Sequence, residues 1–360
     1  MKPERLEVTR TTLPPFEEYC REIRPLWDSC MVTNMGEKHE QFEAALRERL
    51  CCSYVTLFAN GHLALEAALS ALDLPKGSEV ITTPFTFVST THAIVRCGLR
   101  PVFCDVRPSD GTLDPDAAER LISPRTSAIL PVHVYGNICD VERLDALARC
   151  HSLRLVYDAA HAFADSFDGH PAAVYGDASV LSFHATKVFS TVEGGAVCCS
   201  SPEMCSKLKD IRNFGIRDKE TCVAVGGNAK LNELQAAMGL CNLRHFDEAV
   251  AARQAAAAIY REMLAAIPGA PLPFPSGCSY FPVLFASQAQ RDAAALELDR
   301  NGIGARKYFW PLTSDMSCYS GFDKGNTPVA RDISSRILTL PLFPGLTPED
   351  IHRIVSLLPV

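Results

Sequence analysis

One lysine in this sequence stands in surroundings that suit covalent chemistry. Lys187 closes the segment Ser-Phe-His-Ala-Thr-Lys (182–187), is followed by apolar Val188 and Phe189, and has no Lys or Arg beside it. A lysine held there loses part of its hydration, which favours the neutral amine that attacks a carbonyl to form a Schiff base. The alternative is a lysine on a solvent-facing loop, the commonest position for this residue type.

A carboxylate follows another apolar run. Asp158 comes directly after Leu153–Tyr157, and open α/β sheets bind ligands just beyond the carboxyl ends of their strands. A buried carboxylate needs a cationic partner there, and one such partner is the protonated pyridine nitrogen of pyridoxal phosphate (PLP). The alternative is that Asp158 caps the turn or helix that follows it.

A third signal suits an anion. Asn60-Gly61-His62 closes one predicted strand and opens a helix, where free N–H groups and the positive end of the helix dipole attract anions. The alternative is an ordinary Asn-Gly turn. Ser182 offers a hydroxyl to a phosphate, and Glu193-Gly194-Gly195 forms a tight turn into the next strand. Anion cradle, carboxylate and lysine, each at a strand's end, are together the parts of a PLP site.

The elements that must position these residues alternate between short apolar runs and longer helical patterns from about residue 50 to 200. We expect an α/β fold with a seven-stranded, mostly parallel sheet, because the strands are apolar on both faces. The predicted strands are Tyr54–Phe58, Glu79–Thr82, Arg100–Phe103, Ala128–Val134, Leu153–Tyr157, Ser179–Phe183 and Gly195–Cys199. The predicted helices between them are His62–Leu72, Phe87–Cys97, Asp114–Leu121, Val141–His151 and Pro202–Asn213.

The pattern changes after Gly227, where the helices Asn232–Asn242 and Phe246–Ala266 are predicted. The rest reads as a smaller α/β unit with the segments Tyr280–Phe285, Gln290–Asn301, Ile303–Tyr308 and Pro348–Leu358. We therefore predict a large domain over residues 1–245 and a small C-terminal domain over 246–360.

Composition excludes several classes of function. The formal net charge is -7 and no basic run offers a stripe for phosphate backbones, so we expect no nucleic-acid partner. No apolar span is long enough to cross a membrane, and the stretch 1–10 is mostly polar, without a signal core. The fifteen cysteines form no C-x-x-C pair, which predicts free thiols in a reducing compartment and hence a cytoplasmic protein. Histidines and cysteines never reach ligand spacing, so no metal site is expected, and no dinucleotide or P-loop motif follows a strand.

The chain resembles the DegT/DnrJ/StrS-type sugar aminotransferases, which are fold-type-I PLP enzymes, over nearly its whole length. The motifs that carry the resemblance are Phe-Ala-Asn-Gly-His-Leu-Ala-Leu (58–65), Thr-Pro-Phe-Thr-Phe-Val-Ser-Thr (83–90), Pro-Val-His-Val-Tyr-Gly (131–136), Tyr-Asp-Ala-Ala-His-Ala-Phe (157–163), Ser-Phe-His-Ala-Thr-Lys (182–187), Glu-Gly-Gly (193–195), Arg-Asn-Phe-Gly-Ile (212–216) and Gly-Asn-Ala-Lys-Leu-Asn-Glu-Leu-Gln-Ala-Ala (227–237).

The resemblance implies a role for each matching residue. Lys187 binds the cofactor as a Schiff base and then moves the proton between cofactor and substrate carbons, and Asp158 pairs with the pyridine nitrogen. The other implied cofactor contacts are Ser182 and the amides of Gly61, His62 and Leu63 at the phosphate, Phe87 stacked on the ring, His161 near the ring hydroxyl, and Asn228 reaching the phosphate from a partner subunit, which implies a homodimer. The family usually has Thr where His62 stands, and many members have Gln where His161 stands.

The implied reaction passes the amino group of L-glutamate to a keto sugar carried on a nucleotide. The motif Ser-Phe-His-Ala-Thr-Lys-Val-Phe with Glu-Gly-Gly resembles that of a family branch that acts on carbon 4 of dTDP-4-keto-6-deoxyglucose. The expected substrate-binding residues are His184, Arg212, Asn213, Lys230, Tyr308 and Phe309. Arg212, Arg217, Lys230, Arg306 and Lys307 are candidates for the diphosphate, with surface charge or small-domain packing as the alternative for Arg217, Arg306 and Lys307.

Three other functions stay open. The same machinery serves a transaminase for carbon 3 of a keto sugar or for a keto-cyclitol. A dehydratase removes a hydroxyl, but relatives of that kind carry His in place of the lysine, and this chain has Lys187. A non-enzymatic PLP-binding regulator is disfavoured because no DNA-binding helix or basic patch is visible.

Overall fold

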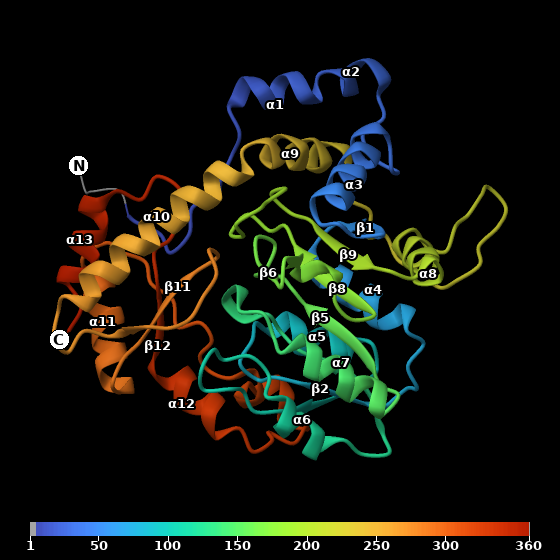
Figure 1. Cartoon of the computed structure of the whole chain (residues 1–360). Coiled ribbons are helices and arrows are strands. Elements are labelled where there is room, and N and C mark those ends of the chain that lie inside the picture. The colour runs from blue at the N-terminus through green and yellow to red at the C-terminus, as the bar shows by residue number, and fades with distance from the viewer. Residues whose placement is uncertain (1–4, 360) are drawn as a thin grey trace.

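A seven-stranded sheet forms the centre of the molecule (Figure 1). The computed structural model describes residues 5–359, so part of the polar stretch 1–10 lies outside the described residues. In the order of the sheet, the strands are β1 (Tyr54–Phe58), β9 (Gly195–Cys199), β8 (Ala178–Ser182), β5 (Arg154–Asp158), β4 (Thr126–Leu130), β2 (Glu79–Thr82) and β3 (Arg100–Phe103). Only β9 runs antiparallel to its neighbours within this sheet, so the predicted mostly parallel α/β fold is confirmed.

Both faces of the sheet are covered, because alternate residues of each strand enter different cores. Val180 of β8 joins a core with helices α4 (Gly61–Ala71), α5 (Val88–Arg96) and α8 (Pro202–Arg212). Its neighbour Leu181 joins the opposite core, with α3 (Glu37–Arg49) and α9 (Glu233–Arg244). Further along that face, α6 (Pro115–Leu121) and α7 (Val141–Cys150) cover β2, β4 and β5. This two-sided burial is why the strands read as continuous apolar runs.

One predicted strand is too long. The sequence predicts a strand over Ala128–Val134, but β4 ends at Leu130. The next residue is Pro131, which has no N–H to donate to a neighbouring strand. The chain leaves the sheet there and turns through Tyr135, which has a left-handed φ of 57°.

Elements at both ends of the chain complete the fold. The N-terminal helices α1 (Phe16–Ile23) and α2 (Pro25–Ser29), together with α3, were not predicted. Beyond α9, the long helix α10 (Phe246–Ala265) runs from the main sheet to a three-stranded antiparallel sheet (Figure 1). This sheet consists of β10 (Leu272–Pro273), β11 (Phe281–Leu284) and β12 (Ile337–Leu340), with α11 (Gln288–Arg300), α12 (Pro328–Arg336) and α13 (Pro348–Ser356) around it. A two-stranded hairpin, β6 (Ser166–Phe167) and β7 (His170–Pro171), lies before β8.

Helix α10 takes part in two cores. Phe246 packs with α3 and the main sheet, whereas Tyr260 packs with the small sheet and α13. A further core joins Phe85 and Tyr135 to Phe309 and Ile333, so segments near the main sheet are packed directly against C-terminal ones. The boundary at residue 245 stays a prediction.

The carboxylate of Glu233 holds the start of α3. Glu233 is fully buried and accepts hydrogen bonds from the backbone N–H groups of Gly36 (3.0 Å), Lys38 (2.7 Å) and His39 (3.4 Å). These are among the N–H groups that a helix N-terminus leaves without an internal partner, and a negative charge there also complements the helix dipole. The motif residue Glu233 therefore ties α9 to α3.

We predict that Glu233→Gln lowers the free energy of unfolding by about 1–3 kcal/mol, because the amide removes the charge and leaves buried N–H groups poorly paired. The measurement is the urea midpoint at fixed protein concentration. The control is Glu248→Gln, whose carboxylate is on a side chain that is 87% exposed. Equal midpoints for the two variants contradict the prediction.

Two further findings concern the whole chain. Within residues 5–359, no helix is both long enough and apolar enough to span a bilayer. All fifteen cysteines are free thiols.

Candidate active site

A cavity of about 510 Å³ opens at the carboxyl ends of the parallel strands. It is bounded by the end of β8 and the loop after it, by the start of α4, by the segment after β5, and by residues 280, 306, 308 and 309 near the small sheet. Of the predicted site residues, it brings together Gly61, His62, Phe87, Asp158, His161, Ser182, His184, Lys187, Tyr308 and Phe309.

Lys187 lies in the loop that joins β8 to β9. The loop is closed on itself by hydrogen bonds from Phe183 N–H to Gly194 O (2.8 Å) and from Thr191 N–H to Phe183 O (2.9 Å). The buried side chains of Phe183 and Phe189 fix it to the core. Loss of hydration lowers the pKa of Lys187 to about 8, although the nearby Asp158 opposes this shift. Lys187 lines the cavity and is only partly exposed, so it does not lie on a solvent-facing loop.

Asp158 ends β5 and is 5% exposed. One carboxylate oxygen accepts from the Thr90 hydroxyl (2.7 Å) and the other from the Ala160 N–H (3.1 Å). Burial raises the pKa of Asp158, while these two hydrogen bonds and Lys187 oppose the shift. Through the Ala160 bond Asp158 does cap the turn that follows it, but no helix begins there. The cap uses one carboxylate oxygen, and the burial of Asp158 in the cavity wall is a separate feature.

The anion cradle at the start of α4 depends on close backbone packing. Asn60 caps the helix by accepting from the Leu63 N–H (2.9 Å). A Cβ on Gly61 would lie 2.8 Å from the Cβ of Ser182, and one on Gly195 would lie 2.6 Å from the Gly61 nitrogen. Glycine at both positions therefore lets the Ser182 hydroxyl and the helix N-terminus face the same space.

The structure corrects one of the predicted phosphate contacts. The Leu63 N–H is already bonded to the Asn60 side chain, so it is not available to an anion. The N–H groups of Gly61 and His62 have no hydrogen-bond partner within the described part of the chain. Of the three N–H groups of Gly61, His62 and Leu63, the Asn60 cap uses one, so the cradle offers two backbone donors.

The His62 ring takes a position that the usual Thr could not fill. Its Nε2 lies 3.0 Å from a Glu66 carboxylate oxygen and its Nδ1 lies 2.9 Å from the Ser89 hydroxyl. Because a carboxylate only accepts, Nε2 carries the proton and Nδ1 accepts from Ser89 in the neutral ring. Both ring nitrogens of His62 therefore have partners within the chain, and only the backbone N–H of His62 is available to an anion.

His161 is neutral and its tautomer follows from one bond. The Tyr135 N–H donates to Nδ1 (3.2 Å), so the ring proton sits on Nε2. Burial, with a smaller contribution from the charge of Lys187, holds the pKa of His161 well below its ordinary value. The ring lies parallel to Phe309 at 5.9 Å between centroids, in the cavity wall. His161 thus presents a permanent N–H donor.

The remaining predicted residues at the cavity are aromatic or lie at its rim. The Phe87 side chain is 52% exposed in the single chain. Tyr308 and Phe309 form the wall that also contains His161. His184 accepts from the Thr186 N–H (3.2 Å) and lies 3.6 Å from Glu193.

Arg212 does not line the cavity, so its predicted contact with substrate is wrong. The side chain is buried beneath β1, where it donates to the Leu57 carbonyl oxygen (3.2 Å) and lies 3.1 Å from His39 Nε2. Burial lowers the pKa of Arg212, although Glu43 opposes this. Its role in this structure is to join α8 to β1 and α3.

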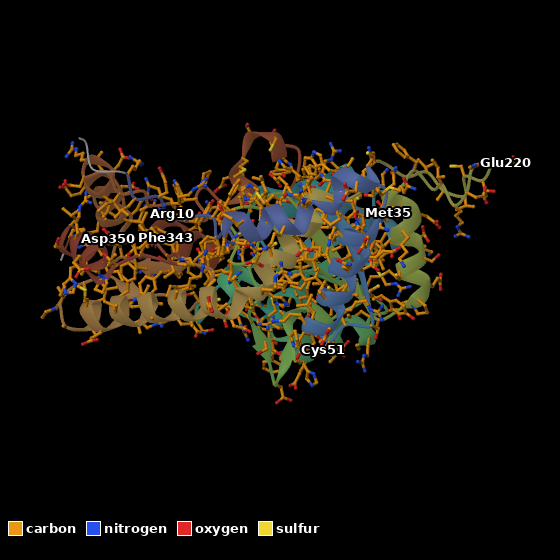
Figure 2. The ribbon with its side chains drawn as sticks, turned by 90° about the horizontal axis from the view of Figure 1, so that it is seen from above. Arg10, Met35, Cys51, Glu220, Phe343 and Asp350 are labelled. Atoms are coloured by element: carbon orange, nitrogen blue, oxygen red, sulfur yellow. The ribbon has the colours of Figure 1, made fainter. Side chains whose placement is uncertain are left out.

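Asn213, Lys230 and Asn228 lie together outside the cavity of their own chain. They stand at the base of the hairpin 213–228, where Asn213 pairs with Asn228 and Lys230 donates to the Asn213 side chain (2.8 Å). The hairpin extends away from the body of the molecule, with Glu220 near its tip (Figure 2). None of the three is among the residues that line the cavity of their own chain.

Sequence reasoning missed the residues that support Asp158. Thr90 must donate its only hydroxyl proton to Asp158, so the bond between Thr86 and Thr90 (2.9 Å) runs from Thr86. Both threonines lie in the motif 83–90, which could have marked them as site residues. Their connection to Asp158, however, depends on how α5 packs over the sheet. Glu193, Tyr280 and Arg306 also line the cavity.

A second cavity, of about 610 Å³, lies at the opposite ends of the strands. It is lined by residues such as Arg154 and Leu155 at the start of β5 and Lys207 on α8. Its cations are paired within the chain, as with Arg154 and Asp177 (2.9 Å) and Lys207 and Asp73 (2.6 Å). It contains no group comparable to Lys187, so the site of chemistry is the first cavity.

The residues of the first cavity fit pyridoxal phosphate. A buried carboxylate without a cationic hydrogen-bond partner among residues 5–359 suits a pyridinium. The close approach of Gly61 to Ser182, which a Cβ on Gly61 would prevent, suits a phosphate, and a lysine whose lowered pKa increases its neutral fraction suits an aldehyde. Fold and site together define the class of fold-type-I PLP-dependent enzymes.

Comparison with known proteins gives the family. The sequence profile of the DegT/DnrJ/EryC1/StrS aminotransferase family matches residues 16–359. A dTDP-4-amino-4,6-dideoxy-D-glucose transaminase of Shigella dysenteriae is 42% identical, with 97% of each chain covered. One of Escherichia coli is 37% identical, with 99% of each covered. The crystal structure of DesI in the presence of its TDP-sugar product matches with a TM-score of 0.93 and 33% identity, covering 99% of this chain and 92% of DesI.

The chain therefore belongs to the DegT/DnrJ/EryC1/StrS aminotransferase family. It is a PLP-dependent sugar aminotransferase, as the sequence predicts.

We predict that the rate at which the apoprotein captures PLP depends on pH through Lys187. With a pKa of about 8, roughly a tenth of the amine is neutral at pH 7, against about one part in 3,000 at the ordinary value. The initial rate of growth of the visible imine band should rise about tenfold per pH unit below about pH 7, about fivefold from pH 7 to pH 8, and level off above pH 9. Lys187→Ala, which has no amine, should show no such band. A rate that stays flat with pH, or that keeps rising far above pH 8, contradicts the prediction.

Proposed function

We propose that this enzyme transfers the amino group of L-glutamate to carbon 4 of dTDP-4-keto-6-deoxyglucose, giving dTDP-4-amino-4,6-dideoxyglucose. The single observation that carries the chemistry is the half-buried Lys187 amine, with its lowered pKa, beside the buried Asp158 in one cavity. The substrate is supported by the two relatives from Shigella dysenteriae and Escherichia coli that carry the corresponding name.

Each residue has a proposed task. When bound, PLP supplies an aldehyde carbon that exchanges amino groups and a ring that withdraws electrons from the reacting carbon. Lys187 would hold the cofactor through its amine, and the same nitrogen, as a neutral amine, would accept and return a proton. Asp158 keeps the proton on the pyridine nitrogen, and His161 donates its Nε2–H to the ring oxygen. Phe87 covers the ring face, and Ser182 with the amides of Gly61 and His62 binds the phosphate.

We further propose that the enzyme is a homodimer with shared sites. The hairpin 213–228 exposes four large apolar side chains, Phe214, Ile216, Val223 and Val225, and Val225 is fully exposed in the single chain. An extended hairpin with such a surface is typical of an interface rather than of a face in water. In this arrangement Asn228, Lys230 and Asn213 at the hairpin base approach the partner's cavity. The cytoplasmic location stays a prediction from composition.

The dimer is tested by the mass in solution. We expect light scattering to give twice the mass of one chain, and we expect Val225→Asp to shift the equilibrium toward the monomer, because a charge at an apolar interface loses its hydration. Glu220→Gln, at the tip of the same hairpin, is the matched control. A wild-type protein that is monomeric at every concentration contradicts the proposal.

The reaction is tested in two halves. L-Glutamate should convert the visible spectrum of the holoenzyme, and the keto sugar should restore it, with one 2-oxoglutarate formed per amino sugar. Asp158→Asn should slow the L-glutamate half by about 10- to 100-fold, the value of a charge-assisted hydrogen bond of roughly 1.5–3 kcal/mol.

The product decides between the proposal and its alternatives. NMR that places the amine on carbon 4 supports the proposal, whereas an amine on carbon 3, or on a cyclitol acceptor, identifies the other transaminases. Loss of a hydroxyl without 2-oxoglutarate identifies a dehydratase. A holoenzyme that reacts with no amino donor, and whose biological effect survives Lys187→Ala, identifies a regulator.

A further inference from the structure

The five cations considered for the sugar nucleotide occupy very different places in the structure. Four of them are engaged elsewhere in the chain: Arg212 with Leu57 and His39, Arg217 with Asp210, Lys230 with Asn213, and Lys307 with Asp292. Arg306 alone of the five lines the cavity that contains Lys187.

The backbone fixes Arg306 while its charge is left free. Its N–H donates to the Thr339 carbonyl oxygen (3.1 Å), and its own carbonyl accepts from the Thr339 N–H (2.8 Å), so the segment is tied to β12. The guanidinium lies over the Tyr308 ring, with Cζ 4.4 Å from the centroid. No acidic side chain pairs with it among residues 5–359. Arg306 is thus a preoriented cation without a counterion.

A turn in the backbone separates Arg306 from its neighbour Lys307. The chain turns tightly at Lys307, because the Tyr308 N–H donates to the Arg306 carbonyl oxygen (2.9 Å). Arg306 and Tyr308 both line the cavity, whereas Lys307 does not. Lys307 forms an ion pair with Asp292 on α11. Two adjacent cations therefore differ in one respect that matters, namely whether they face the cavity.

Tyr280 adds a neutral donor to the same wall. It is 4% exposed, it lines the cavity, and its hydroxyl has no hydrogen-bond partner in the part of the chain that is described. Burial raises the pKa of Tyr280 to about 12, although the charges of Arg253 and then Arg306 oppose this, so the hydroxyl keeps its proton. Both residues pack against Tyr308 in the cavity wall, and a guanidinium and a hydroxyl that face one cavity can donate together to one pair of oxygens.

The substrates of the proposed function carry the group that such a wall recognises. L-Glutamate has two carboxylates and the sugar nucleotide has a diphosphate, and the planar fork of arginine binds both kinds of oxygen pair in a bidentate way. The cofactor phosphate is already provided for by the start of α4, on a different element. We propose that Arg306, with Tyr280, anchors the anionic group of the substrate, a carboxylate or a diphosphate. This inference rests on the proposed function.

The test measures binding without chemistry. Holoenzyme is titrated calorimetrically with glutarate, a dicarboxylate that lacks the amino group, and separately with dTDP. Arg306→Met, which removes the charge but keeps a long side chain, should weaken at least one of the two by about 10- to 100-fold. Tyr280→Phe should weaken the same ligand by about fivefold, the loss expected of one neutral hydrogen bond. Lys307→Met is the matched control and should change neither affinity.

The outcomes identify the source of the anion. A loss for glutarate alone assigns the carboxylate of the amino donor, a loss for dTDP alone assigns the diphosphate, and a loss for both assigns one anchor that serves each half-reaction in turn. Affinities that do not change in Arg306→Met, or that fall equally in Lys307→Met, overturn the inference. An unchanged visible band of bound PLP in each variant shows that the fold is intact.

The proposed function and the Arg306 anchor can be contradicted independently of each other. A wild-type enzyme that turns over while Arg306→Met binds both ligands normally removes the anchor and leaves the function. A wild-type enzyme that transfers no amino group from L-glutamate, but whose anion binding depends on Arg306, removes the function and leaves the anchor.

Discussion

The placement of the Lys187 amine opposite the Asp158 carboxylate is the constraint on which the rest of the structure depends. Each group alone prefers water, and loss of hydration shifts the pKa of each toward its neutral form. Their mutual attraction offsets only part of this cost, so further hydrogen bonds are required. For Asp158 these come from Thr90 and the Ala160 N–H. Lys187 has no comparable set of acceptors within the described chain, and it is the group whose neutral form the chemistry needs.

The topology of the sheet explains how these groups meet. β5 and β8 are neighbours, so Asp158 at the end of one strand lies close to the loop that follows the other. β9 then returns antiparallel between β8 and β1, which brings Gly195 against the backbone at Gly61. The phosphate cradle and the lysine loop are therefore parts of one packed unit, in which a side chain on either glycine would separate the elements.

The sequence predicted correctly the bounds of strands that are flanked by clear turn or loop residues. β1, β2, β3 and β9 have the predicted bounds, whereas β4 was extended past Pro131 because Val132 and Val134 continue the alternating apolar pattern. Helix α3 was missed because its stretch is dominated by charged and polar residues and its N-terminus is stabilised by Glu233, about 195 residues further along the chain. A partner so distant in sequence leaves no local signal.

The site was predictable where a residue's chemistry is carried by its own motif. Lys187, Asp158, Gly61 and Ser182 each end or follow a strand, and parallel strands bring such positions to one edge. Arg212 was misplaced because only the three-dimensional packing of His39 and Leu57 shows that its side chain points into the core. Thr90 was missed for the related reason that a threonine inside a helix carries no sign of the carboxylate it faces.

The two departures from the common family pattern have different physical meanings. At position 161 the Tyr135 N–H fixes the tautomer, so the imidazole presents an N–H donor in the way that the amide of the more common Gln does. Because burial also keeps His161 neutral, this donor does not change near neutral pH, and the replacement preserves the hydrogen-bonding function. At position 62 the His ring is instead held by Glu66 and Ser89, so the hydroxyl of the usual Thr is not replaced by an equivalent donor. The phosphate side of this site must then rely more on backbone N–H groups and Ser182, and these are the groups that the glycine contacts hold most rigidly.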